Sequence, residues 1–291
     1  MAISASSSTE LRGYAKPAAL VDTDWVKANL GKPGFKLVEV DVDTRQYEAG
    51  HLPGSVGFNW QTQLQDALRR DILSKTAFEK LLGDAGISRT DAVILYGDNN
   101  NWFAAYGFWL FKLYGHPDVR LMNGGRVKWL NESDKPLTTE ATAVTPAPYQ
   151  ASEPDLALRA FVTAVLEASK SGAANLVDVR SPDEFTGKVI APPGMSETAQ
   201  RGGHIPGAKS VPWSTAVRPD GTFKPVEELR EIYLEKAGVD PRKPTIAYCR
   251  IGERSSHTWF VLKYLLGLEH VTNYDGSWTE YGNLVGVPIE K

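Results

Sequence analysis

Short runs of β-branched and aliphatic residues alternate along the chain with segments whose apolar residues recur at helical spacing. The β-branched runs predict strands at residues 37–42, 93–96 and 245–248. The helical spacing predicts helices at residues 76–86, 161–169 and 226–237. Gly86, at the end of the first of these helices, suits a helix C-terminus. Strands and helices in alternation predict an α/β fold, in which each sheet is mostly parallel and flanked by helices.

The same motifs occur twice. Residues 37–41 (LVEVD) recur as 176–180 (LVDVR), and residues 50–55 (GHLPGS) recur as 203–208 (GHIPGA). From residue 93 onward, a constant offset of 152 positions relates the two halves, so that Gly115 matches Gly267 and Gly124 matches Gly276. A register held over so many residues indicates a tandem duplication.

The duplication predicts the domain organisation. We expect an N-terminal tail at residues 1–20, a first domain at 21–140, a linker at 141–155 and a second domain at 156–291. The linker is predicted from its Pro, Ala and Thr content and its lack of periodicity. The second half also has 14 more residues than the first before its Gly-His motif, at about residues 188–201. Their polar composition predicts a surface loop.

Composition excludes several classes of protein. The 291 residues are 42% hydrophobic and 23% charged, which is typical of a packed globular protein, and the net charge of -3 gives no case for a nucleic-acid partner. No apolar run is long enough to span a bilayer, and the N-terminus lacks the features of a secretory signal. The single cysteine excludes an internal disulfide and a zinc site built from several thiolates. We expect a cytoplasmic monomer without metal or cofactor.

The one cysteine, Cys249, directly follows the predicted strand at residues 245–248 and precedes an apolar helical segment. A strand–loop–helix joint directs backbone N–H groups and the positive end of a helix dipole at the loop. Arg250 and Arg254 add two cations, and Gly252 permits a sharp turn. The alternative is an inert buried cysteine, but these neighbours favour a reactive thiol with a lowered pKa.

Cysteine-dependent phosphatases carry an arginine six positions after the cysteine, where this chain has Ser255; its arginine comes one position earlier. The shorter loop suits a single sulfur atom better than a phosphate. With the repeated halves, the Asp178-Val179-Arg180 motif and the Gly-His-Ile-Pro-Gly motif, the chain resembles the tandem-domain rhodaneses, specifically the thiosulfate sulfurtransferases. The likeness covers nearly the whole chain after the first twenty residues.

The resemblance implies a double displacement. The Cys249 thiolate attacks the outer sulfur of thiosulfate, sulfite leaves, and cyanide or a thiol then takes the sulfur from the persulfide. We expect the loop residues to hold the anionic persulfide, as an oxyanion hole does, and arginines to bind the dianionic donor. The expected cradle residues are Ile251, Gly252, Glu253 and Ser255, with the loop's own Arg250 and Arg254 binding the donor. Arg180 and Arg201 are further candidate donor contacts.

Other polar residues of the repeated motifs have structural interpretations. His51 and His204 are expected to hydrogen-bond the turn before Pro-Gly. Asp178 is expected to form a salt bridge with Arg180. Glu184 stands where some rhodaneses carry a substrate-binding arginine, so that contact is not carried over.

The first half lacks the chemistry of the second. Gly97 stands opposite Cys249 in the repeat, and it is followed by Asp98 and three asparagines. Neither a nucleophile nor a cation is present in this stretch. The sequence therefore predicts a catalytically inactive first domain.

Two alternatives to a thiosulfate sulfurtransferase stay open. A 3-mercaptopyruvate sulfurtransferase would use a donor with one carboxylate, and the two loop arginines favour a dianion over it. A persulfide carrier protein would load one sulfur and deliver it to a partner protein without turnover on small acceptors.

Overall fold

The computed structural model describes residues 13–66, 68–192, 194 and 198–291. In this part the chain forms two compact units. Unit 1 comprises Lys16–Asp155 and Arg218–Phe223, and unit 2 comprises Gly13–Ala15, Leu156–Val217 and Lys224–Lys291. Each unit has its own parallel sheet with helices packed on it, which confirms the predicted α/β fold with two similar domains.

The sheet of unit 1 has five strands in the order β1-β7-β6-β2-β3, and all neighbours run parallel. β6 is buried at every position, as expected of a central strand covered on both faces. The strands of this sheet are β1 (Leu20–Val21), β2 (Phe35–Asp41), β3 (Ser55–Asn59), β6 (Ala92–Tyr96) and β7 (Val119–Met122). A separate antiparallel pair is formed by β4 (Gln65–Asp66) and β5 (Asp71–Ile72).

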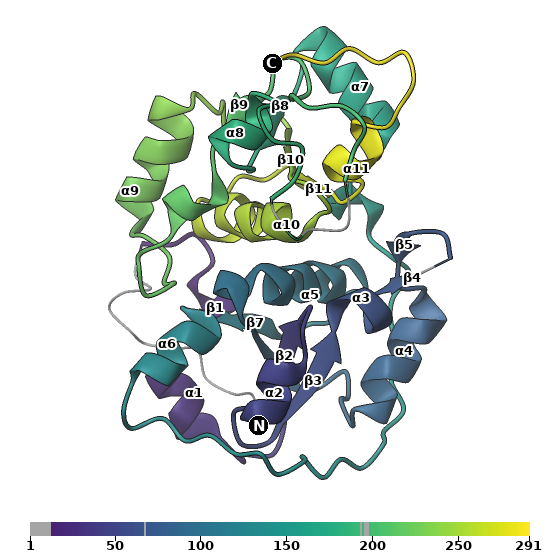
Figure 1. Ribbon diagram of the computed structural model, residues 1–291. Coiled ribbons are helices and arrows are strands. Elements are labelled where there is room, and N and C mark those ends of the chain that lie inside the picture. The colour runs from purple at the N-terminus through teal and green to yellow at the C-terminus, as the bar shows by residue number, and fades with distance from the viewer. Residues whose placement is uncertain (1–12, 67, 193, 195–197) are drawn as a thin grey trace. The chain divides into compact units, whose positions relative to one another are not determined.

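The longest helix of unit 1, α5 (Trp102–Leu113), packs against β2, β6 and β7 (Figure 1). Ten of its twelve residues are buried, so it forms much of the core of this unit. The other helices of unit 1 are α1 (Thr23–Asn29), α2 (Arg45–Ala49), α3 (Trp60–Gln63), α4 (Lys75–Asp84) and α6 (Gly125–Asn131).

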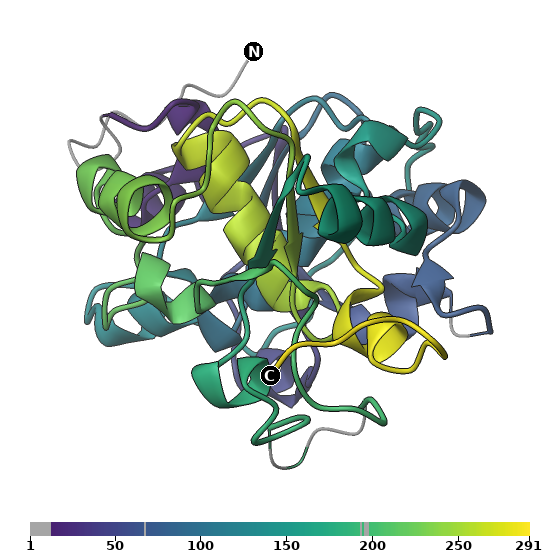
Figure 2. The same ribbon diagram turned by 90° about the horizontal axis from the view of Figure 1, so that it is seen from above.

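The sheet of unit 2 has the order β11-β10-β8-β9, again with all neighbours parallel. Helix α10 (Glu253–Phe260) packs against β10 and β11, and Figure 2 shows it lying along this sheet. The strands are β8 (Asn175–Asp178), β9 (Lys209–Ser210), β10 (Thr245–Tyr248) and β11 (Val271–Tyr274). The other helices are α7 (Val162–Ser171), α8 (Pro182–Phe185), α9 (Val226–Arg230) and α11 (Ser277–Tyr281).

The predicted elements are found with small shifts at their ends. The three predicted strands correspond to β2, β6 and β10, and the three predicted helices to α4, α7 and α9. α9 stops at Arg230 and continues as a π-helical turn to Lys236. At the end of α4, Gly86 has a φ of +63°, as expected of a glycine at a helix C-terminus. At its start, Ser74 Oγ accepts a hydrogen bond from the Ala77 N–H at 3.3 Å.

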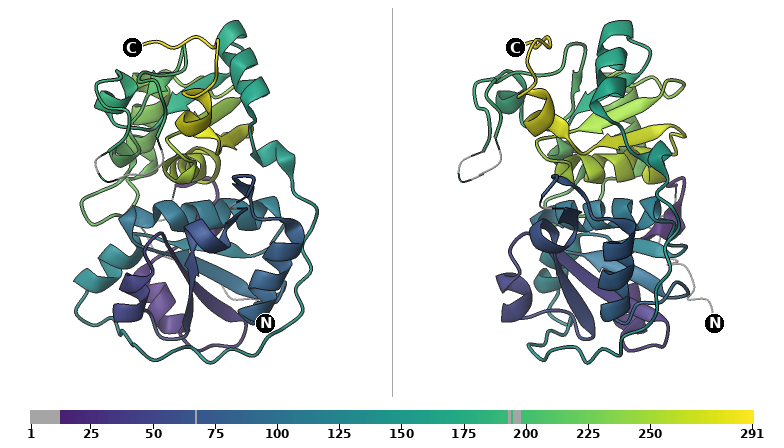
Figure 3. Two further views of the ribbon diagram at one scale, coloured as in Figure 1. Left: turned by 45° about the vertical axis from the view of Figure 1, so that its right-hand side comes forward. Right: turned by 90° about the vertical axis from the view of Figure 1, so that its right-hand side faces the viewer.

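The predicted tail and linker differ from the structure. Residues 1–12 lie outside the described residues, but residues 13–20 are packed rather than free: the Ala15 N–H donates to the Leu265 carbonyl at 2.9 Å, and Leu20 is in β1. The predicted linker at 141–155 belongs to unit 1, along which it runs as an extended segment (Figure 3). It is held there by hydrogen bonds such as Ala147 N–H to the Gly83 carbonyl (2.9 Å).

The predicted surface loop at 188–201 is described except for residues 193 and 195–197. Val189 and Ile190 are exposed at its start, whereas Ala199 near its end is buried. Ala199 therefore packs into unit 2, while Thr198 and Gln200 on either side of it are exposed, as expected of a surface loop.

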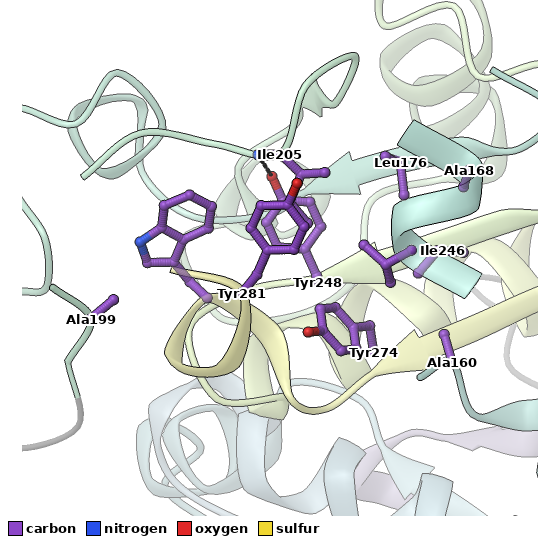
Figure 4. Close-up of a cluster of buried hydrophobic side chains, with 11 residues drawn as sticks. Ala160, Ala168, Leu176, Ala199, Ile205, Ile246, Tyr248, Tyr274 and Tyr281 are labelled. Atoms are coloured by element: carbon purple, nitrogen blue, oxygen red, sulfur yellow. Dashed lines mark hydrogen bonds between the residues drawn. The ribbon is translucent and has the colours of Figure 1, made fainter. Parts of the chain in front are cut away.

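The two halves repeat individual hydrogen bonds. The Leu52 N–H donates to the Tyr96 hydroxyl at 3.2 Å, and the Ile205 N–H donates to the Tyr248 hydroxyl at the same distance. Figure 4 shows the second of these bonds within the buried cluster of unit 2, where Tyr248 lies beside Tyr281. These buried tyrosines tie the Pro-Gly turn to the central strand in each unit.

The histidines of the repeated motif also occupy equivalent places. His51 Nδ1 contacts the Tyr47 carbonyl, and His204 Nδ1 contacts the Phe185 carbonyl, both at 2.9 Å. Each ring also stacks on the aromatic side chain of that same residue. These contacts support the structural interpretation of both histidines.

Candidate active site

Cys249 directly follows β10, whose four residues are buried, at the carboxyl end of the parallel sheet of unit 2. This edge is where parallel α/β sheets bind ligands. The side chain of Cys249 is fully buried, and the loop from Cys249 leads into α10 through Gly252, which has a φ of +105°. A side chain at Gly252 would place its Cβ 2.9 Å from the Asp275 Cα, so both conformation and space require glycine here.

The loop places a backbone donor against the sulfur atom. The Gly252 N–H donates to Cys249 Sγ at 3.1 Å. Ser255 lies close enough to lower the pKa of Cys249, while its hydroxyl donates to Asn273 Oδ1 at 2.6 Å. One contact has the opposite character, because the thiol donates to Glu253 Oε2 at 3.4 Å. Of the sequence-predicted cradle residues, Gly252 and Glu253 thus hydrogen-bond the sulfur, and Ser255 acts on its pKa.

The backbone of the loop is fixed by the turn after β11. The Ser277 hydroxyl accepts from the Cys249 N–H at 3.1 Å and donates to the Tyr274 carbonyl at 2.7 Å. The Trp278 N–H donates to the Cys249 carbonyl, and the Thr279 N–H donates to the Arg250 carbonyl. Four backbone groups are therefore satisfied without any side chain of the loop itself.

Ser277 is a site residue that the sequence reasoning missed. It has a φ of +52°, a left-handed conformation that is costly for a residue other than glycine, asparagine or aspartate. In the repeat it stands at the position of Gly125, whose φ is +55°. The sequence signal for this residue is a serine at a repeat position where the first unit has a left-handed glycine. A serine there is strained, and only a bond made by its hydroxyl would offset that backbone strain.

The expected lowering of the Cys249 pKa is wrong for the protein as it stands. Burial raises the pKa of Cys249, and the Glu253 carboxylate raises it further. Arg254 and Ser255 act in the lowering direction but do not prevail. The sequence shows the cations next to the cysteine, but it does not show how completely the thiol is removed from water.

Arg254 is not a free cation. Its two terminal nitrogens donate to the two carboxylate oxygens of Glu184, each at 2.9 Å, and both side chains are buried. Glu184 also accepts from the Ser181 N–H, closing the capping box of α8. Although burial alone would raise the pKa of Glu184, the hydrogen bonds from Arg254 hold it below its usual value. The prediction that Arg254 binds the donor stays a prediction, and in the structure both terminal nitrogens of its guanidinium are bonded to Glu184.

Arg180 forms the expected salt bridge. Its Nη2 lies 2.6 Å from Asp178 Oδ2 and 2.7 Å from the Gly203 carbonyl, and its guanidinium stacks over Trp278. In unit 1, Arg126 binds the matching Glu39 and the matching Gly50 carbonyl. A guanidinium thus holds the same two groups in both units, although it comes from different positions, which indicates a structural role.

Arg201 is held by the C-terminal segment. Its guanidinium donates to four carbonyls there, including those of Leu284 (2.6 Å) and Val287 (3.0 Å). The prediction that Arg201 contacts the donor stays a prediction, although these carbonyls engage its guanidinium. Of the remaining predicted site residues, Arg250 and Ile251 lie buried in the loop directly after Cys249.

The equivalent loop of unit 1 is built differently. The Gly97 N–H donates to Asn101 Oδ1 at 3.0 Å, and Asn101 Nδ2 donates to the Met122 carbonyl at 2.7 Å. A Cβ at Gly97 would lie 2.3 Å from the Val40 carbonyl oxygen. The loop also holds a carboxylate, Asp98, where unit 2 has a guanidinium. It therefore contains no thiol and has no room for one.

Comparison with known proteins agrees with these features. Residues 22–132 and 162–284 each match the description "Rhodanese-like domain". The chain belongs to the rhodanese family. This match and the relatives below confirm the predicted tandem-domain sulfurtransferase family.

Two curated relatives of this rhodanese align over nearly its full length. A "Putative thiosulfate sulfurtransferase" of Haloferax volcanii is 55% identical over 283 residues, covering 96% of this chain and 98% of the relative. The "Sulfur carrier protein TtuD" of Thermus thermophilus is 54% identical over 283 residues, covering 96% and 99%. Among solved structures, SseA from Escherichia coli, described as a 3-mercaptopyruvate sulfotransferase, has a TM-score of 0.78 at 26% identity and covers 89% of this chain and 98% of that one.

Two kinds of feature are missing from the described part of the rhodanese. Within residues 13–66, 68–192, 194 and 198–291, no helix combines the length and the hydropathy needed to cross a bilayer. In the same residues, His, Cys, Asp and Glu side chains do not gather in groups of three that could bind a metal ion.

Proposed function

We propose that this rhodanese moves the sulfane sulfur of thiosulfate to cyanide or a thiol through a persulfide on Cys249. The observation that carries the proposal is the hydrogen bond from the Gly252 N–H of the loop to Cys249 Sγ, at 3.1 Å. Such a donor stabilises an anionic sulfur, and a persulfide on Cys249 would place its anionic terminal atom next to Sγ at the same loop. A thiosulfate sulfurtransferase is also the name carried by the relative from Haloferax volcanii.

The persulfide requires an outside acceptor. Cys249 is the single cysteine of the chain, so an intramolecular disulfide cannot discharge it. The acceptor must be a small nucleophile such as cyanide, or the thiol of another molecule.

In this proposal the three arginines Arg250, Arg254 and Arg180 contribute to donor binding in different ways. Arg250 lies beside the nucleophile and remains the proposed contact to the anionic donor. Arg254, held by Glu184, contributes a fixed positive charge next to Sγ. Arg180 has one nitrogen, Nη1, without a hydrogen-bond partner among the described residues, and this nitrogen is its proposed donor contact.

Steady-state kinetics tests this function. Purified protein should produce thiocyanate from thiosulfate and cyanide over many turnovers. Arg250→Ala should raise the KM for thiosulfate at least about tenfold, because a hydrogen bond to a charged group contributes about 1.5–3 kcal/mol. The KM for 3-mercaptopyruvate should change much less, since this donor carries one carboxylate. Equal changes for both donors would contradict recognition of a dianion by Arg250.

A second candidate function is persulfide delivery to a partner protein, which the likeness to the sulfur carrier of Thermus thermophilus supports. A carrier would load one equivalent of sulfur and release it slowly to cyanide. A single burst of thiocyanate without further turnover would favour this function. Faster turnover with 3-mercaptopyruvate than with thiosulfate would instead favour the activity named for SseA.

A further inference from the structure

A buried carboxylate lies against the proposed nucleophile. Glu253 is 2% exposed, and its Oε2 accepts a hydrogen bond from the Cys249 thiol at 3.4 Å. As a fixed charge it opposes thiolate formation, because it raises the pKa of Cys249 beyond the effect of burial. A residue that acted only through its charge would therefore work against the proposed chemistry at this position.

Glu253 is not needed as the counter-ion of Arg254. Its nearest approach to that guanidinium is 3.6 Å, between Glu253 Oε1 and Arg254 Nε. Glu184 already forms two hydrogen bonds of 2.9 Å with the same group. The charge of Arg254 is balanced without Glu253.

Glu253 is also not needed to hold the loop, as the other unit shows. Its repeat equivalent is Asn101, whose side chain bonds the Gly97 N–H and the Met122 carbonyl. In unit 2 the matching N–H and carbonyl, of Cys249 and Tyr274, are both bonded by the Ser277 hydroxyl.

A steric clash explains why Ser277, and not Glu253, bonds the loop in unit 2. A Cβ on Gly125, the equivalent of Ser277, would lie 2.3 Å from Asn101 Oδ1. The loop can be bonded either by the side chain at the start of the helix, as by Asn101, or by a side chain in the turn, as by Ser277, but not by both. In unit 2 the strained Ser277 does so, which leaves the side chain of Glu253 directed at the sulfur.

We propose that Glu253 is the catalytic base of sulfur transfer, accepting the thiol proton of Cys249 as its sulfur attacks the donor. The inference rests on the proposed function and specifies its first step. Sγ forms a bond to the outer sulfur of thiosulfate, and the bond from that sulfur to the sulfonate sulfur breaks. Its electron pair leaves with sulfite, which takes the proton from Glu253 and departs as hydrogen sulfite. The anionic persulfide remains on Cys249, and charge is conserved.

The charged groups around Glu253 come from several elements. Arg254 faces it from the same helix, and Glu184 of α8 binds the far edge of that guanidinium. Behind Gly252, Asp275 is paired with Arg159 at 2.9 Å. Both cations therefore have a closer carboxylate of their own, and Glu253, which approaches Arg254 through Oε1 at 3.6 Å, keeps Oε2 on the thiol.

Glu253→Gln separates this role from a purely electrostatic one. Glutamine keeps the shape of the side chain but cannot take the proton. The thiol pKa would be followed by the NMR shift of the carbon next to sulfur in protein labelled at its single cysteine. The rate of persulfide formation would be followed by rapid mixing with donor and mass spectrometry. Glu227→Gln, an exposed change on α9, is the matched control.

The expected result is a pair of opposite changes. The pKa of Cys249 should fall in Glu253→Gln, because a negative charge is removed, while persulfide formation near neutral pH slows by about 10²-fold, the usual contribution of acid–base catalysis. Glu227→Gln should change neither. A rate of persulfide formation that is unchanged or increased, following the larger thiolate fraction, would overturn the proposal.

Two further measurements keep the test decisive. Glu253→Asp retains a carboxylate and should lose less of the rate than Glu253→Gln; an equal loss would count against a proton acceptor. Each rate is measured with thiosulfate and with 3-mercaptopyruvate. A wild-type protein that loads only from mercaptopyruvate would contradict the proposed donor, and the comparison of the variants on that donor would still decide the role of Glu253.

Discussion

The loop after β6 and the loop after β10 occupy equivalent positions in two repeated units, but only the second carries a cysteine. Gly97 stands where the other unit has Cys249, and Asp98 where it has Arg250. The buried scaffold beneath the two loops is shared, as the matching hydrogen bonds of Tyr96 and Tyr248 show. The proposed chemistry therefore depends on a few loop and turn residues placed on a common framework.

The comparison also separates structural from chemical residues. A guanidinium bonds the same carboxylate position and the same glycine carbonyl in both units, from Arg126 in one and from Arg180 in the other. A contact kept in the unit without a thiol does not require catalysis to explain it. Glu253 and Ser277 differ from their counterparts in chemical type, and both contact Cys249.

Installing a thiol in the first unit tests the comparison most severely. Gly97→Cys in a Cys249→Ser background should show turnover at least about 10⁴-fold below wild type, as for loss of a nucleophile. The new Cβ would meet the Val40 carbonyl oxygen at 2.3 Å. Overpacking of this kind costs about 1–3 kcal/mol, so the variant should also unfold at lower urea concentration than Cys249→Ser alone. Turnover near the wild-type rate would show that the first unit is a latent active site.

The buried pair of Arg254 and Glu184 should behave as a coupled unit. Arg254→Met leaves the Glu184 carboxylate buried without its partner, which should cost about 3–5 kcal/mol of unfolding free energy. The double variant with Glu184→Met should recover part of this loss, because a buried ion pair can be replaced by apolar side chains. Urea unfolding measures both variants against wild type. As a control, Arg242→Met breaks an exposed pair with Asp240 and should cost less than about 1 kcal/mol. A double variant no more stable than Arg254→Met would show that the two residues are not coupled.

The same pair predicts a pH dependence with a definite sign. The pKa of Glu184 is lowered from 4.5 in the folded protein, so its stabilising contribution is complete above that value and is lost as the pH falls through the folded pKa. The stability difference between wild type and Glu184→Gln, measured by urea unfolding at a series of pH values, should therefore shrink in acid. A difference that grows as the pH falls would contradict the assignment.

The smallest expected effect concerns the carboxylates of the first unit. Burial, with repulsion from Asp41, raises the pKa of Asp98 to about 7, and burial, with repulsion from Glu39, raises that of Asp41 to about 7. The folded state then binds more protons than the unfolded state between 3.8 and about 7, so stability falls as the pH rises through this window. Asp98→Asn should gain stability relative to wild type above about pH 7 and little near pH 4. Parallel curves of unfolding free energy against pH for the two proteins would contradict this.

The sequence was sufficient for the features that depend on local pattern. The strands at 93–96 and 245–248, the repeat register and the position of Cys249 at a strand end all follow from periodicity and spacing. It was not sufficient for features that depend on distant partners. Arg254 is neutralised by a residue 70 positions away, and Arg201 is bonded by carbonyls such as that of Leu284, 83 positions away. Such pairings, and the burial that raises the Cys249 pKa, exist only in the folded chain.

The central claim is that the second unit alone carries sulfur, on Cys249. The most direct measurement is the intact mass of the protein after incubation with thiosulfate and removal of the donor. Wild type should gain the mass of one sulfur atom and lose it again when cyanide is added, whereas Cys249→Ser should gain nothing. A sulfur adduct on Cys249→Ser, or its absence from wild type, would contradict the claim.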